Sequence, residues 1–92
     1  MRVLVVEDEG KVAADLGRAL KGSGLVVEHA ADGETAWFQG DTENYDLVIL
    51  DLGLPKLDGL QVLKRWRANQ RTMPVLVLTA RDSWSENMWW IP

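Results

Sequence analysis

The feature that most constrains the fold is a short apolar run that ends in an aspartate. Leu47 to Leu50 contain no polar residue, and Asp51 follows them directly. Such a run is typical of a strand that is buried on both faces of a parallel sheet. Open α/β sheets bind their ligands at the carboxyl ends of such strands. Asp51 is therefore the leading candidate for a functional residue.

Strand and helix patterns alternate along the rest of the chain. Helical spacing of apolar residues follows each of the first three predicted strands, and the four predicted strands span residues 3–6, 25–30, 46–51 and 75–78. This order predicts one α/β domain, a doubly wound parallel sheet with helices on both faces. A length of 92 residues, with 47% hydrophobic and 26% charged residues, suits a single globular domain.

Helix capping signals support this division of the chain. Asp32 and Asp58 are predicted to cap the second and third helices. Ser83, with Glu86 three residues later, indicates that a fourth helix begins there. His29 lies on the second strand, which we expect at an edge of the sheet because it carries polar residues, and we assign it no role.

Composition excludes several classes of function. The net charge of −4 argues against direct nucleic-acid binding by this chain, because no basic stripe can neutralise phosphates. The absence of cysteine excludes disulfides and cysteine-based zinc sites. The N-terminal apolar run is too short for a signal peptide or a membrane span. We expect a soluble, cytoplasmic domain.

Polar side chains follow three predicted strands at one rim of the sheet. Glu7 and Asp8 follow the first strand, Asp51 ends the third, and Thr79 follows the fourth. Two like charges about 4 Å apart repel by roughly 4 kcal/mol at an effective dielectric near 20, so this cluster calls for a cation or raised pKa values. Mg²⁺ takes carboxylate oxygens as ligands. Together with a carboxylate nucleophile it suggests phosphoryl transfer onto Asp51, with Thr79 bonding a phosphoryl oxygen.

These residues resemble the receiver domain of two-component response regulators. The matching pieces are Val-Val-Glu-Asp-Glu at 5–9, Leu-Asp-Leu-Gly-Leu-Pro-Lys-Leu-Asp-Gly at 50–59 and Leu-Thr-Ala-Arg-Asp at 78–82. The second and third pieces are most similar to receivers attached to winged-helix DNA-binding domains. The resemblance implies a flavodoxin-like, CheY-like fold with strand order 2-1-3-4-5, in a phosphoacceptor rather than an enzyme.

The resemblance also implies a role for each site residue. Asp51 would accept a phosphoryl group from a phosphohistidine of a sensor histidine kinase, and Thr79 would move toward that group. Asp8 and Asp51 would bind Mg²⁺ through their carboxylates, Gly53 through its backbone carbonyl, and Glu7 through a water.

The chain departs from the family's pattern after about residue 86. Asn-Met-Trp-Trp-Ile-Pro stands where the family continues to a fifth strand that ends in a phosphate-contacting lysine, and to a fifth helix. We therefore expect a truncated receiver over 1–86 with four strands, followed by an atypical tail over 87–92. The fourth strand would be a bare apolar edge, which predicts a homodimer or a domain-swapped oligomer formed through that strand.

Other interpretations compete with this one. Without the lysine, the chain would be a receiver-like interaction or dimerisation module that is inactive in phosphotransfer. A Mg²⁺-dependent phosphatase would carry the motif Asp-x-Asp after the first strand, where this chain has Glu-Asp-Glu. A flavin carrier of similar fold would need a phosphate-binding loop at the same place. Glu7 and Asp8 could instead cap the first helix, and Thr79 could be a plain strand-end residue. Trp37 and Trp66 are expected in the core.

Overall fold

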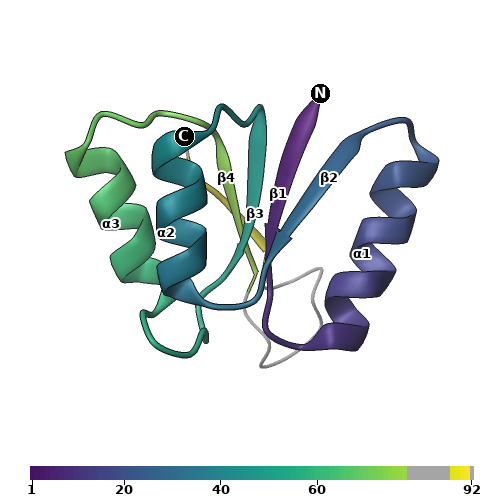
Figure 1. Cartoon of the computed structure of the whole chain (residues 1–92), viewed down its shortest axis with the longest axis horizontal. Helices are drawn as coiled ribbons and strands as arrows, with labels where there is room; N and C mark the ends of the chain where they lie inside the picture. The colour runs from purple at the N-terminus through teal and green to yellow at the C-terminus, as the bar shows by residue number, and fades with distance from the viewer. Residues whose placement is uncertain (79–87, 92) are drawn as a thin grey trace.

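A computed structural model of the 92-residue chain describes residues 1–78 and 88–91. Strands and helices alternate over the first 78 residues, and a last strand follows (Figure 1). The elements are β1 (Arg2–Val6), α1 (Gly10–Gly22), β2 (Val26–Ala30), α2 (Gly33–Thr42), β3 (Leu47–Asp51), α3 (Gly59–Ala68), β4 (Val75–Leu78) and β5 (Met88–Ile91).

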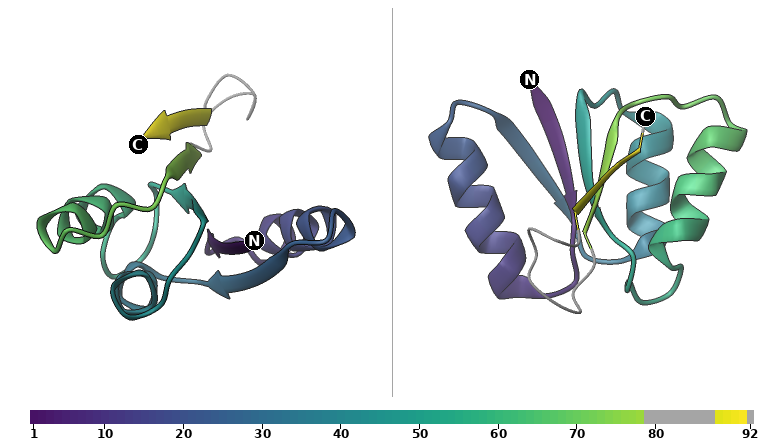
Figure 2. Two further views of the ribbon diagram at one scale, coloured as in Figure 1. Left: turned by 90° about the horizontal axis from the view of Figure 1, so that it is seen from above. Right: turned by 180° about the vertical axis from the view of Figure 1, so that it is seen from behind.

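The strands form one sheet in the order β2-β1-β3-β4-β5. The first four are parallel to one another, so the predicted four-stranded parallel sheet is confirmed, and β2 lies at an edge as expected. Helix α1 covers one face, and α2 and α3 cover the other (Figures 1 and 2). This is the flavodoxin-like, doubly wound arrangement that the order of strand and helix patterns predicts.

The sheet separates two apolar layers because successive side chains of each strand point to opposite faces. Val3, Val5 and Ile49 face α1 and pack with leucines of that helix. The larger layer lies under α2 and α3, and the side chain of Trp66 is fully buried in it. Trp37 is partly buried against the same layer, so both tryptophans contribute to the core.

The capping predictions for α2 and α3 are confirmed. The Asp32 carboxylate accepts a hydrogen bond from the Thr35 backbone N–H at 2.8 Å. The Asp58 carboxylate accepts one from the Gln61 backbone N–H at 3.0 Å. Each bond satisfies a donor that the first turn of a helix leaves free, so each helix begins at a defined residue.

The tail adds a strand that the sequence patterns did not indicate. β5 pairs antiparallel with β4, with Leu76 opposite Trp90. The prediction that β4 has a bare edge is therefore wrong. The physical reason lies in the tail itself, because aromatic and β-branched residues favour strands and the apolar edge of β4 offers free backbone groups to pair with. A contact between two chains through β4 would first require β5 to leave that edge.

Two sequence predictions fall outside the described residues: the role of Thr79 and the helix start at Ser83 and Glu86. In the described part of the chain, none of the helices has the length and apolar character that a membrane span requires.

Candidate functional site

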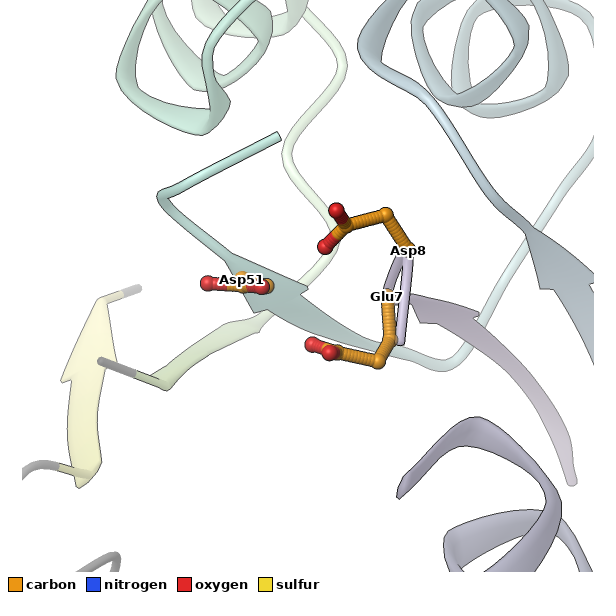
Figure 3. Close-up of side chains that lie close together, drawn as sticks. All are labelled: Glu7, Asp8 and Asp51. Atoms are coloured by element: carbon orange, nitrogen blue, oxygen red, sulfur yellow. The ribbon is translucent and has the colours of Figure 1, made fainter. Parts of the chain in front are cut away.

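Three carboxylates meet at the carboxyl ends of β1 and β3. Glu7 and Asp8 follow β1, and Asp51 is the last residue of β3 (Figure 3). One carboxylate oxygen from each residue lies within 4.8 Å of the others. Glu7 and Asp51 are buried, whereas Asp8 is exposed, so the cluster opens to solvent on one side. The predicted convergence of Glu7, Asp8 and Asp51 is thus confirmed.

Strand register explains why these residues meet. Val6 of β1 lies opposite Leu50 of β3, so the next residue of each strand, Glu7 and Asp51, falls at the same level. The Glu7 backbone N–H donates to the Ala30 carbonyl of β2 at 3.0 Å, which holds Glu7 against the sheet beyond the last β1 residue. The site is therefore built on strand ends that the core fixes in place.

The Glu7 carboxyl is the group most affected by this crowding. Burial, followed by contact with the Asp51 carboxyl, raises the pKa of Glu7 to about 7. Over residues 1–78, ion pairs join Arg2 and Arg18 to other acids, and none includes a carboxylate of the cluster. The local charge is therefore uncompensated by the described side chains. An oxygen-only set of this kind fits a hard divalent cation such as Mg²⁺.

The loop after β3 orients Asp51. The Gly53 backbone N–H donates to Oδ1 of Asp51 at 3.0 Å. The Gly59 N–H donates to the Leu52 carbonyl at 3.1 Å, and a Cβ added at Gly59 would lie 2.8 Å from Leu52 Cα. The first residue of α3 therefore packs directly on the backbone beside Asp51. Gly53 lies next to the carboxylate as predicted, and its carbonyl as a metal ligand stays a prediction.

The alternative role for Glu7 and Asp8 as helix caps is wrong. The N-cap of α1 is Glu9, whose carboxylate accepts a hydrogen bond from the Lys11 backbone N–H at 3.3 Å. Glu7 instead accepts one from the Glu9 N–H at 3.1 Å, and burial followed by the contact with Asp51 raises the pKa of its carboxyl. Both acids are thus left for the cluster.

One residue near the site has a contact that the sequence did not reveal. His29 is exposed on the edge strand β2, as expected, but its Nε2 lies 2.8 Å from the Glu7 carbonyl oxygen. The residues are 22 positions apart, and only the parallel pairing of β1 with β2 brings them together. No local sequence pattern could have indicated this contact.

Known proteins share both the sequence and the fold. Residues 3–88 match the response regulator receiver domain family. The transcriptional regulatory protein QseB of Haemophilus influenzae is 44% identical over 88 residues, which cover 96% of this chain and 40% of QseB. The chain thus spans less than half of this relative's length.

Solved receiver structures superpose closely on the chain. A Francisella response regulator receiver domain has a TM-score of 0.83 at 35% identity, with 92% of this chain and 70% of that one covered. The response regulator TrrA of Thermotoga maritima, solved in complex with Mg²⁺ and BeF, has a TM-score of 0.82 at 34% identity, with 94% and 75% covered. With its sheet order and acidic cluster, this chain belongs to the response regulator receiver domain family.

Proposed function

We propose that this chain is the phosphoacceptor of a two-component system and that Asp51 receives a phosphoryl group from a sensor histidine kinase. The observation that carries the proposal is the convergence of Glu7, Asp8 and Asp51 within 4.8 Å at the ligand-binding rim of the sheet. The structure of the similar protein TrrA, solved in complex with Mg²⁺ and BeF, supports a metal and a phosphoryl-like group as ligands of this fold.

The transfer needs a nucleophile that is held in position. An Asp51 carboxylate oxygen would attack phosphorus, a P–O bond would form, and the P–N bond to the kinase histidine would break. The departing imidazole nitrogen keeps the bonding electron pair and takes up a proton from solvent. The Gly53 N–H donates to Oδ1 of Asp51 and so helps to hold the carboxylate in position for the attack.

Glu7, Asp8, Asp51 and the Gly53 carbonyl would hold the metal. Mg²⁺ at this position supplies positive charge that offsets the negative charge of the phosphoryl oxygens and of the carboxylates. The resemblance to the family assigns Glu7 to the metal through a water, and its buried carboxyl lies within 4.8 Å of those of Asp8 and Asp51. In this scheme the chain receives the group and is not itself an enzyme.

Two further parts of the proposal rest on the family. Thr79 follows Leu78, which lies opposite Asp51 in the β3–β4 register, and the family assigns the residue there to contact with the phosphoryl group. The relative QseB is a transcriptional regulatory protein of which this chain spans 40%. We propose that the chain serves transcription regulation in the same way, as a receiver of the winged-helix type.

Phosphorylation with a small phosphodonor and Mg²⁺, followed by intact mass, tests the central proposal. The wild-type chain should gain one phosphoryl group, and Asp51→Asn should gain none. Asp46→Asn is a matched control, because Asp46 directly precedes β3 at its other end and contacts the Arg2 N–H. Equal labelling of wild type and Asp51→Asn would contradict the proposal.

A second function is favoured by one observation, namely that none of the described lysines makes an ion pair with the cluster. Under this alternative the chain binds a partner or a second copy of itself but does not accept phosphate. Beryllofluoride with Mg²⁺ separates the two functions, because it should change the tryptophan fluorescence only if the phosphoryl pocket forms. An unchanged spectrum, together with no mass gain, would favour the interaction module.

A further inference from the structure

The segment between β3 and α3 links Asp51 to the start of α2. This segment, residues 52–58, contains Gly53, whose N–H bonds the Asp51 carboxylate. Farther along it, the Pro55 carbonyl accepts hydrogen bonds from the Gly33 N–H at 3.2 Å and the Leu57 N–H at 2.8 Å. The first residue of α2 therefore touches the loop that orients the nucleophile.

Gly33 allows this contact only because it has no side chain. Gly33 is buried, and a Cβ added there would overlap the Leu57 carbonyl oxygen and lie 2.8 Å from Leu57 Cβ. The oxygen belongs to the backbone, so the overlap cannot be relieved by a side-chain rotation. The loop or the helix would have to move apart by more than an ångström, and the loop that would shift is the segment that contains Gly53.

We propose that Gly33 is a positioning residue for the Mg²⁺ site, acting through the 52–58 loop. Its close approach fixes the Pro55–Leu57 backbone, which in turn fixes the Gly53 N–H that orients Asp51 and the Gly53 carbonyl that would bind the metal. Asp32 assists by capping α2 immediately before Gly33, through the hydrogen bond that its carboxylate accepts from the Thr35 N–H. The inference rests on the proposed function of the cluster.

Gly33→Ala is the direct test, and Gly40→Ala is its matched control. Both glycines are buried in α2, and a Cβ at Gly40 would lie 2.5 Å from Cζ2 of Trp66, between α2 and α3 and away from the loop. Alanine has a higher helix propensity than glycine, so a loss of stability in either variant arises from the steric contact of the added Cβ and not from helix propensity. Both variants should lose stability, but only Gly33→Ala should bind Mg²⁺ more weakly, by about tenfold, as when a partner of a metal ligand is lost.

Calorimetric Mg²⁺ titration gives the affinity, and the NMR shift of the Gly53 amide gives the loop position. We expect that amide to move in metal-free Gly33→Ala and to stay in Gly40→Ala. If Gly33→Ala does not fold, Asp32→Ala is the second variant, because it removes the N-cap of α2 and weakens the first turn of the same helix. We expect its Mg²⁺ affinity to fall by about twofold to fivefold.

The outcomes separate the inference from the proposed function. A wild-type chain that does not bind Mg²⁺ would overturn both. A wild type that binds, with a folded Gly33→Ala or Asp32→Ala variant that binds equally well, would overturn the positioning role and leave the function intact. A similar loss of affinity in Gly40→Ala would also overturn it, since the effect would then be one of general stability.

Discussion

At the scale of single residues, Glu7 makes the stability of the metal-free protein depend on pH. Its pKa is about 7 in the folded chain against an ordinary value of 4.5, because burial and Asp51 oppose its charge. Between these two values the folded state binds more protons than the unfolded state. The contribution of Glu7 to stability is therefore complete below pH 4.5 and is lost as the pH rises through 7.

Glu7→Gln should remove that dependence. With a chelator present to remove metal, the free energy of unfolding of wild type should fall relative to that of Glu7→Gln as the pH rises from about 4.5 to 8. Denaturant unfolding measures this difference. Glu34→Gln, at an exposed position of α2, should follow wild type across the range. If the stability difference between wild type and Glu7→Gln stayed constant with pH, the raised pKa would be refuted.

At the scale of elements, the C-terminus of α3 holds a residue in a costly conformation. Gln70 has a φ of 60°, and its N–H bonds the Arg67 carbonyl while the Arg71 N–H bonds the Trp66 carbonyl. This is the helix-ending pattern that glycine favours, because a Cβ there costs roughly 1–2 kcal/mol. Glycine also loses more conformational entropy on folding, which offsets about 0.5–1 kcal/mol of that gain.

Gln70→Gly should therefore stabilise the chain by about 0.5–1 kcal/mol, and raise Tm by about 2–8 °C. The side chain is exposed, so little packing is lost. Gln70→Ala retains a Cβ and should show no gain. Thermal unfolding by circular dichroism measures all three proteins, and a lower Tm for Gln70→Gly than for Gln70→Ala would show that the conformation carries no such cost.

The order of elements could be predicted from the sequence because its signals are local. The apolar run at 47–50 and the caps at Asp32 and Asp58 each depend on a few adjacent residues, and all are found in the structure. β5 was missed because four apolar residues in a tail do not distinguish a strand from a helix. Its partner is an edge that only the assembled sheet provides.

The candidate site also contains one part that the sequence predicts and one part that it does not. Glu7, Asp8 and Asp51 could be predicted because residues that follow parallel strands meet at one rim. The approach of Gly33 to Leu57 could not, since the two residues lie more than 20 positions apart in the sequence and meet only because α2 packs closely on the loop. Contacts of this kind follow from packing and leave no periodic pattern.

At the scale of the whole molecule, β5 decides which edge of the sheet is free. β4 presents Val75 to Leu78, an apolar strand without charge, and such edges pair readily with other chains. In the structure β5 of the same chain occupies that edge. Homodimerisation through β4 stays a prediction, and its route would be exchange of β5 between two chains or its release from the edge.

Replacing both Trp89 and Trp90 with proline should release the edge. In an antiparallel pair, one of any two consecutive residues directs its N–H at the partner strand. Replacing both residues therefore removes a hydrogen bond to β4, whichever of the two donates it. Proline also fixes φ away from strand values. We expect light scattering after size exclusion to show greater self-association than for wild type, increasing with concentration. Valine at both positions keeps the strand propensity and should preserve the wild-type mass. An unchanged mass for the proline variant would mean that β5 does not protect β4 from other chains.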